Sequence, residues 1–324
     1  DDASLLEQVL VPRSQVEMLL PVAIGDYTDF YASREHATNV GSMFRGPENA
    51  LMPNWLHLPV AYHGRSSSVV ISGTPIHRPN GQRRSGDGSP EFGPTTQLDF
   101  ELEVGAIVGT GNALGTAIPV GRALDHVFGL VLVNDWSARD IQAWEYQPLG
   151  PFLGKNFATT ISPWVVPLEA LAPFRRSAPP PDPEPLPYLR DAAGSTFDLH
   201  LEVGLQPAET AEETAVCRSN HRHLYWTLAQ QVAHHTVNGC NLRPGDLLAS
   251  GTISGPEPES RGCLLELTWR GTQPLTLRSG GTRTFLADGD TVTMRGWAQG
   301  DGYRVGFGEC TGQILGTGEA RSSR

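Results

Sequence analysis

Short runs of apolar residues, many of them alternating with polar ones, dominate this chain. Residues 98–109 (LDFELEVGAIVG) alternate cleanly, residues 66–76 read as a strand entering a turn, and residues 292–298 and 303–310 read as late antiparallel strands. A period of two is typical of strands with one buried face. The pattern therefore predicts a mixed, β-rich fold, a rolled or sandwiched sheet of mostly antiparallel strands with a few short helices.

Helical signals are fewer and cover three segments: residues 28–40, 137–146 and 219–237. Thr28 is suited to cap the first helix, and Gly41 is suited to end it. In the second segment Ser137, followed three residues later by Asp140, resembles a capping box. We therefore expect these helices to begin at Thr28 and near Ser137.

The clearest change of composition is the proline-rich stretch at residues 175–189 (RRSAPPPDPEPLPYL). It is unsuited to a regular helix or a central strand, and by itself it could link two domains or form a long surface loop. The length of 324 residues, 39% of them hydrophobic, allows one large domain or two ordinary ones. Residues 319–324 read as a loose tail.

Charge and composition argue against some functions. The net charge is −11 and no basic stripe is visible, which argues against a nucleic-acid partner. The longest aliphatic run, residues 127–133, is far shorter than the roughly 20 residues of a membrane span, and no signal peptide opens the sequence. The four cysteines are scattered, so we expect buried thiols in a reducing compartment, the cytoplasm.

Acidic residues alternate with apolar ones in LDFELEVG, residues 98–105. If this is one strand, Asp99, Glu101 and Glu103 share a face, with the two glutamates roughly 6.5–7 Å apart. Two carboxylates this close repel each other unless water or a cation separates them. The segment alone is compatible with a solvated strand face and with half of an oxygen-ligand site for Ca²⁺ or Mg²⁺.

Two further groups of polar residues are candidates for chemistry. Asp135, Arg139, Gln142 and Tyr146 would follow one helical face if Asp135 began the helix, and the alternative is a solvated amphipathic face. His36 would lie two turns from Asp29 in the first predicted helix. Histidine is the usual general base, although a single histidine is more often structural.

Several familiar motifs can be set aside. The stretch GTGNALG at residues 109–115 is not a dinucleotide-binding GxGxxG, and the chain has no GxSxG for a serine hydrolase. The histidines at 221–223 and 234–235 have no set of zinc-ligand partners, so we interpret them as structural or surface residues.

Four long stretches resemble the fumarylacetoacetate hydrolase family: residues 24–76, 98–105, 133–167 and 238–260. The similarity extends essentially from residue 20 to residue 315. It implies a β-sandwich roll of that family's type, with one catalytic domain over residues 21–318 and the stretch 175–189 as a loop inside it. Residues 1–20 would then be a remnant of the connection from an additional N-terminal domain, which fits a sequence that opens without methionine.

The resemblance also implies an activity. Members of the family use water to cleave the carbon–carbon bond of 4-fumarylacetoacetate, a β-diketone, into fumarate and acetoacetate, the last step of tyrosine and phenylalanine catabolism. A divalent cation, Ca²⁺ or alternatively Mg²⁺ or Mn²⁺, holds the dicarbonyl, and a second Mg²⁺ or a monovalent cation is possible. The resemblance further implies a homodimer whose substrate is a small β-diketo acid.

Roles for individual residues follow from matching positions. Four residues match the cation ligands: Asp29, Glu101, Glu103 and Asp135. Lys155 and Thr159 match residues near the second cation. His36 matches the general base and Glu266 the carboxylate that orients it. Three residues match donors that stabilise the oxyanion and the carbanion: Arg139, Gln142 and Lys155. The substrate-binding positions are Tyr31, Arg45, Tyr62, Arg139, Gln142, Tyr146 and Thr252.

Two alternatives remain open at this point. A related acylpyruvate hydrolase or oxaloacetate decarboxylase would share the carboxylate triad, but those enzymes tend to be shorter and to lack the segment that begins at residue 35. A non-catalytic metal-binding scaffold would be expected to have lost His36, Glu266 or Lys155, all of which are present.

Overall fold

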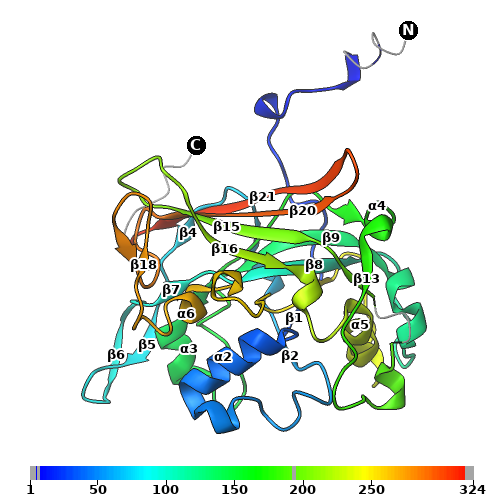
Figure 1. The fold of residues 1–324 in the computed structure, drawn as a ribbon, viewed down its shortest axis with the longest axis horizontal. Helices are drawn as coiled ribbons and strands as arrows, with labels where there is room; N and C mark the ends of the chain where they lie inside the picture. Colours follow the sequence, from blue (N-terminus) through cyan, green and yellow to red (C-terminus); the bar gives the residue numbers. More distant parts are fainter. Residues whose placement is uncertain (1–4, 6–7, 192–194, 318–324) are drawn as a thin grey trace.

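The computed structural model of this protein describes residue 5, residues 8–191 and residues 195–317. The predicted tail at residues 319–324 lies outside the described residues, as does part of the segment 1–20. Two sheets organise the molecule (Figure 1). In the described part, every strand pair is antiparallel except β1–β17, β11–β3 and β21–β4. The predicted β-rich class of mostly antiparallel strands is confirmed.

The larger sheet runs in the order β2 (Ala61–His63), β1 (Tyr27–Phe30), β17 (Leu247–Ala249), β8 (Leu102–Val108), β9 (Val127–Asp135), β11 (Thr159–Ile161) and β3 (Val69–Ile71), and β12 (Val166–Pro167) also pairs with β9. The five-stranded sheet runs in the order β16 (Thr214–Asn220), β15 (His200–Gln206), β20 (Thr291–Gln299), β21 (Arg304–Leu315) and β4 (Ile76–His77). The predicted late antiparallel strands are therefore β20 and β21.

Short hairpins and helices complete the described fold. Four strand pairs stand apart from the two sheets: β7 (Leu98–Asp99) with β10 (Ser137–Ala138), β5 (Asn80–Arg84) with β6 (Pro90–Pro94), β13 (Arg175–Ser177) with β14 (Ser195–Phe197), and β18 (Leu275–Thr276) with β19 (Thr282–Arg283). The α-helices are α2 (Arg34–Arg45), α3 (Arg139–Glu145), α4 (Leu168–Leu171), α5 (Leu228–Thr236) and α6 (Leu264–Leu267). The 3₁₀ turns are Arg13–Gln15, Pro47–Asn49, Ser66–Ser68, Val120–His126, Ala172–Phe174, Pro187–Leu189, His221–His223 and Pro258–Ser260.

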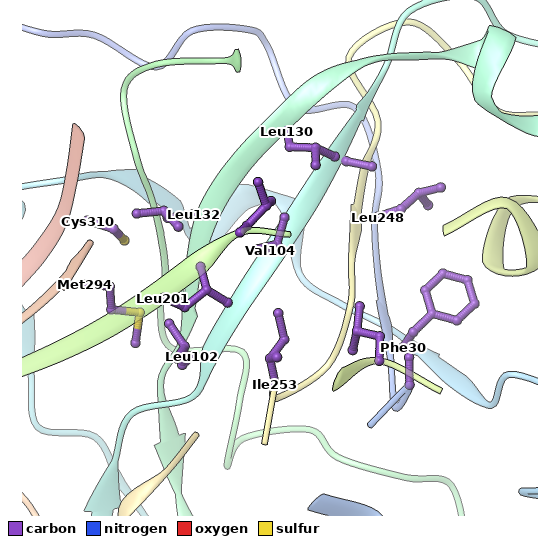
Figure 2. Close-up of a cluster of buried hydrophobic side chains, with 14 of the residues drawn as sticks. Phe30, Leu102, Val104, Leu130, Leu132, Leu201, Leu248, Ile253, Met294 and Cys310 are labelled. Atoms are coloured by element: carbon purple, nitrogen blue, oxygen red, sulfur yellow. The ribbon is translucent and has the colours of Figure 1, made fainter. Parts of the chain in front are cut away.

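The main core lies between the two sheets. Figure 2 shows residues of β8 and β9 from the larger sheet beside residues of β15, β20 and β21 from the smaller one: Leu102, Val104, Leu130, Leu132, Leu201, Met294 and Cys310. The sheets pack closely at Gly296 of β20, where a Cβ atom would lie 2.7 Å from Leu132. Since burial of each large apolar side chain contributes about 1.5–3 kcal/mol, this interior fixes the larger sheet firmly in place.

The opposite face of the larger sheet carries both apolar and acidic side chains. Tyr27, Ile107, Val131 and Val133 are buried on it. Side chains alternate along a strand, and residues paired across two strands share a face. Asp29, two residues after Tyr27, and Asp135, two residues after Val133, therefore project from this same face. Glu103, which pairs with Val133, does so as well.

The helices differ from the predictions at their starts. Residues 27–30 form strand β1, and α2 begins only at Arg34, where Ser33 rather than Thr28 is the cap and accepts a hydrogen bond from the His36 N–H. The helix continues to Arg45 and ends at Gly46 instead of Gly41. The placement of Asp29 and His36 on one helical face was therefore wrong.

The second and third predicted helices also begin later. Helix α3 begins at Arg139 without a side-chain cap, because Ser137 lies in β10 and its hydroxyl donates to the Asp135 carbonyl. The predicted capping box with Asp140 was therefore wrong, and Asp135 ends a strand instead of starting a helix. The segment 219–237 is α-helical only in α5, capped by Thr227, and a separate 3₁₀ turn at His221–His223 precedes it.

The proline-rich stretch 175–189 contains β13 at its start and a 3₁₀ turn at its end, with irregular chain between them. The four cysteines are free thiols, as the scattered spacing predicts, and three of them are buried. None of the helices described by the structure has the length and apolar character needed to cross a lipid bilayer.

Candidate active site

Four buried carboxylates meet on one face of the larger sheet. Asp29 projects from β1, Glu103 from β8 and Asp135 from the end of β9, while Glu101 lies in the connection between β7 and β8. One carboxylate oxygen from each of the four lies within 4.8 Å of the others. The structure thus brings together the four residues that the sequence singled out as cation ligands.

The sequence placed Asp99 on the same strand face as the two glutamates, and the structure does not. The strand is interrupted between Asp99, the last residue of β7, and Leu102, the first of β8. Glu101, in the interruption, forms an isolated bridge with Cys263. Because alternation is broken here, Asp99 points away from the cluster toward α6, where it accepts hydrogen bonds from backbone N–H groups.

Nearby cations only partly balance the four carboxylates. The ammonium group of Lys155 lies 2.6 Å from Glu101 Oε2 and 2.6 Å from Asp135 Oδ2. Burial alone would lower the pKa of Lys155, but the charges of Asp135 and Glu101 raise it instead. Burial likewise favours the neutral form of Glu101, yet Lys155 and Arg139 bring its pKa below the usual range. Glu101 is therefore the best compensated of the four.

Asp29 and Glu103 are much less well compensated. Asp29 Oδ1 and Glu103 Oε1 are buried and have no hydrogen-bond partner in the part of the chain that the structure describes. Burial, followed by the charges of neighbouring carboxylates, raises the pKa of both groups well above its ordinary value. Two orphaned oxygens in an acidic cluster fit a bound cation, because an ion would satisfy the oxygens and cancel the repulsion. A donor set made only of carboxylate oxygens suits a hard divalent cation better than zinc.

A histidine–carboxylate pair lies beside this cluster. His36 Nδ1 is 2.6 Å from Glu266 Oε2, and both side chains are buried. A carboxylate can only accept a hydrogen bond, so the Nδ1 proton points at Glu266 and Nε2 is left free to accept a proton. Burial raises the pKa of Glu266, but contacts with His36, Asn39 and Ser254 lower it overall, which favours the charged carboxylate. Besides His36, three further donors contact this carboxylate.

Those further donors hold Glu266 in place, and sequence reasoning missed all three. Asn39 Nδ2 donates to Glu266 Oε1 at 2.8 Å, while the Ser254 hydroxyl at 2.7 Å and the Cys263 thiol at 3.2 Å donate to Oε2. The spacing of Asn39, one helical turn after His36, was a signal that could have identified it. Nothing in the local sequence marks Ser254 or Cys263.

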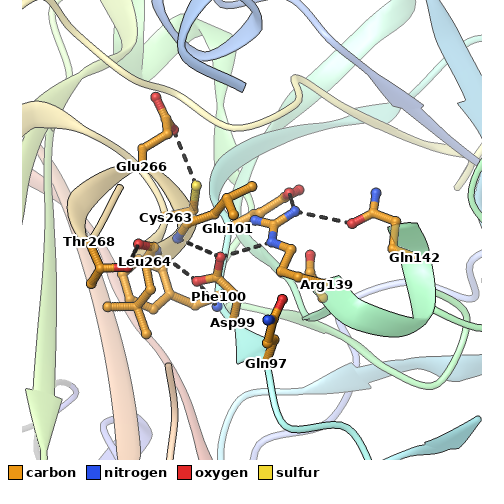
Figure 3. A network of polar contacts seen from close by, with 12 residues as sticks. Gln97, Asp99, Phe100, Glu101, Arg139, Gln142, Cys263, Leu264, Glu266 and Thr268 are labelled. Carbon is orange, nitrogen blue, oxygen red and sulfur yellow. Dashed lines mark hydrogen bonds and ion pairs between the residues drawn. The ribbon is translucent and has the colours of Figure 1, made fainter. Parts of the chain in front are cut away.

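Arg139 contacts both Glu101 and Asp99 (Figure 3). Its Nε donates to Asp99 Oδ2 at 2.9 Å, and its Nη1 donates to Glu101 Oε1 at 2.6 Å and to Gln142 Oε1 at 3.3 Å. Its Nη2 is buried and has no hydrogen-bond partner among the described residues. The carboxylates thus hold Nε and Nη1, while Nη2 remains available as a donor.

The remaining predicted residues divide into two groups. Near the cluster, the Tyr62 hydroxyl donates to Asp135 at 2.8 Å and the Thr159 hydroxyl donates to the same side chain at 3.3 Å. The Tyr31 ring packs edge-on against His36 with centroids 5.2 Å apart. Thr252 Oγ1 is buried without a partner, as expected for a donor that faces a ligand.

Arg45 and Tyr146 are not held at the cluster. The Arg45 guanidinium donates to the backbone carbonyls of Asn49 and Ala50 at the end of α2. The Tyr146 side chain is 39% exposed, and its hydroxyl accepts a hydrogen bond from Gln147.

Comparison with known proteins assigns the family. The model of the fumarylacetoacetate (FAA) hydrolase C-terminal family matches residues 26–315. The chain is 62% identical to fumarylacetoacetase from Bos taurus over 97% of its own length and 75% of that protein, and 63% identical to fumarylacetoacetase from Arabidopsis thaliana over 93% and 72%. The chain belongs to the fumarylacetoacetate hydrolase family.

Solved structures agree on the fold. A putative HpcE protein from Mycobacterium smegmatis superposes with a TM-score of 0.59 at 21% identity, covering 98% of this chain and 85% of that one. A fumarylacetoacetate hydrolase from Exiguobacterium antarcticum gives 0.55 at 19% identity, over 94% and 80%. At these identities the likeness concerns the fold alone.

The carboxylate cluster predicts that a divalent cation stabilises the folded protein. The protein is first treated with chelator and dialysed. Addition of Ca²⁺ or Mg²⁺ at about 100 times the Kd of the parent protein, the same concentration for every variant, should then raise the free energy of unfolding of the parent by about 2.7 kcal/mol, measured by denaturant titration. Glu103→Gln removes one ligand charge and should shrink this gain, whereas Glu212→Gln, at an exposed position, should leave it unchanged. An equal gain in all three proteins would mean that the cation binds elsewhere.

Proposed function

We propose that this protein hydrolyses the carbon–carbon bond of 4-fumarylacetoacetate to fumarate and acetoacetate, the last step of tyrosine catabolism. Identity of 60% or more with curated fumarylacetoacetases over nearly the whole chain supports the substrate. The observation that carries the chemistry is the buried His36–Glu266 pair beside the four-carboxylate cluster. A base beside a cation site is what hydrolysis of a diketone requires.

His36 is the general base in this proposal. Its Nδ1–H is committed to Glu266, so Nε2 takes a proton from water as the water oxygen bonds to the substrate carbonyl carbon. The carbonyl π electrons move onto oxygen and give a tetrahedral oxyanion. The oxyanion then re-forms the C=O bond, which becomes the new carboxyl group of fumarate, and the bond to the neighbouring carbon breaks with its electron pair forming an enolate. The proton held by His36 is transferred to the enolate carbon, which gives acetoacetate.

The oxyanion and the enolate both need fixed positive charge nearby. Arg139 is suited to this because its Nη2 is buried, charged and free of protein partners. Lys155 and the Gln142 amide are further donors on the same side of the site. We assign contacts with the substrate to Tyr31, Tyr62 and Thr252. The substrate would lie between the carboxylate cluster and the His36–Glu266 pair. Arg45 and Tyr146 remain candidates for its carboxylates, reaching it from the surface.

Asp29, Glu101, Glu103 and Asp135 would hold the divalent cation, for which we propose Ca²⁺, with Mg²⁺ or Mn²⁺ as alternatives. When bound, such an ion supplies Lewis-acid polarisation of the dicarbonyl oxygens. Lys155 and Thr159 approach Asp135 and are proposed to border a second Mg²⁺ or a monovalent cation.

We also propose that the chain acts as a homodimer in the cytoplasm. The resemblance in sequence supports the dimer, and four free thiols fit a reducing compartment. Sedimentation equilibrium should give about twice the chain mass of 35.0 kDa. A mass equal to that of one chain would contradict the dimer.

A spectrophotometric assay tests the proposed substrate. The loss of fumarylacetoacetate should be much faster than the loss of a short acylpyruvate, the substrate expected of a related hydrolase. Chelator should stop the reaction, and Ca²⁺ or Mg²⁺ should restore it. A preference for the acylpyruvate would contradict the proposed substrate, and full turnover in chelator after verified metal removal would contradict the role of the cation.

Replacement of the proposed base should abolish turnover without unfolding the protein. His36→Ala removes the proton acceptor and should lower kcat by about 10²–10⁴-fold or more, with binding of cation and product nearly intact. His57→Ala makes the same change at an exposed position and should leave kcat within about twofold. A fully active His36→Ala enzyme would rule out this role.

A further inference from the structure

We propose that Asp99 is a positioning residue that fixes both the Arg139 guanidinium and the short helix bearing Glu266. The proposal rests on the proposed function, in which Arg139 stabilises the oxyanion and Glu266 orients the base. Asp99 itself does not reach the carboxylate cluster. It acts on the chemistry only through the groups that it holds.

Asp99 is completely buried, and each of its hydrogen-bond partners among the described residues is a donor. Its Oδ1 accepts hydrogen bonds from the N–H groups of Phe100 at 2.8 Å and Leu264 at 2.7 Å. Its Oδ2 accepts from the Leu265 N–H at 2.9 Å and from Arg139 Nε at 2.9 Å. Four donors around one carboxylate leave little freedom of rotation. Burial raises the pKa of Asp99 overall, and the contacts with Arg139, Leu264 and Leu265 act in the opposite direction.

The contact with Arg139 decides which guanidinium donor is left for a ligand. Asp99 binds Nε and Glu101 binds Nη1, so the guanidinium plane is held along two edges by two separate carboxylates. The buried, unpartnered Nη2 is thereby fixed in direction. Without Asp99, the guanidinium could rotate about its remaining contact with Glu101 and carry Nη2 away from its position.

The contacts with Leu264 and Leu265 connect Asp99 to α6, the helix that carries Glu266. These N–H groups belong to the first turn of α6, which has no side-chain cap of its own from Cys263. Glu266 is the next residue in this helix and binds His36. Figure 3 shows Asp99 between Arg139 and the start of α6. One carboxylate thus sets the relative position of the oxyanion donor and the residue that orients the base.

A double-mutant cycle distinguishes this role from a contribution to stability alone. Asp99→Asn keeps the size but puts an amide N–H₂ where an N–H donor now points, and it should lower kcat by about 10²-fold through misplacement of Arg139. In an Arg139→Gln background the same change should cost much less, because the group that Asp99 positions is already gone. An equal loss of kcat in both backgrounds would contradict the coupling, as would a folded Asp99→Asn enzyme with the parent kcat.

Asp290 provides a matched control. It is also fully buried, and it accepts two hydrogen bonds from Arg283 and one from the Ala287 N–H, outside the site. Asp290→Asn should destabilise the protein in a similar way but leave the kcat of folded enzyme within about twofold. If it lowers kcat as much as Asp99→Asn does, the effect of Asp99 is general and the proposal is wrong.

Two further measurements cover the remaining outcomes. Arg139→Lys keeps the charge but cannot bind Asp99 and Glu101 as a fork, so its kcat should fall nearly as far as that of Arg139→Gln. A fully active Arg139→Lys enzyme would contradict the proposal even if Asp99→Asn does not fold.

A parent protein that does not hydrolyse fumarylacetoacetate would contradict the proposed function alone. A crystal structure of Asp99→Asn then tests the positioning directly: displacement of Arg139 and α6 supports it, and an unchanged arrangement overturns it.

Discussion

Repulsion among four buried carboxylates is the constraint on which the site depends. Asp29, Glu101, Glu103 and Asp135 come from three strands and one connection, and their oxygens converge within 4.8 Å. Such a cluster is unfavourable without compensating charge, and the folded chain supplies part of it through Lys155. The packed core between the two sheets provides the apolar burial that offsets the cost and prevents the strands from moving apart.

The chemistry of this cluster could be foreseen, but its geometry could not. Residue types and the resemblance indicated the four ligands, yet Asp29 was placed in a helix because Thr28 is a good cap. In the structure Tyr27–Phe30 pairs on both sides, with β2 and with β17, and two ladders of backbone hydrogen bonds outweigh a single cap. Ser33, five residues later, takes the capping role instead. Tertiary context decided between two locally acceptable structures.

The second half of the site depends on contacts that no local pattern contains. His36 and Glu266 are 230 residues apart and lie in contact only because α2 and α6 pack together. Resemblance to a family could assign this pair, whereas spacing alone left His36 as a histidine of uncertain role. Ser254 and Cys263, which also donate to Glu266, were missed, since the resemblance assigned them no role and their contacts arise from position in the folded chain.

In the proposed mechanism the two halves of the site, the His36–Glu266 pair and Arg139, must keep a fixed relation, because His36 would activate the water that attacks the carbon whose oxygen Arg139 would stabilise. If the two halves were joined only through the length of the sheet, each fluctuation of the strands would change the distance between them. The structure instead joins the halves directly at residues 99–101, where the regular strand is interrupted. Asp99 turns toward α6 and Glu101 toward the cation site, and both bind Arg139. The interruption of the strand between Asp99 and Leu102 breaks the alternation of side chains. It therefore allows two carboxylates only two residues apart, Asp99 and Glu101, to face opposite sides of the site.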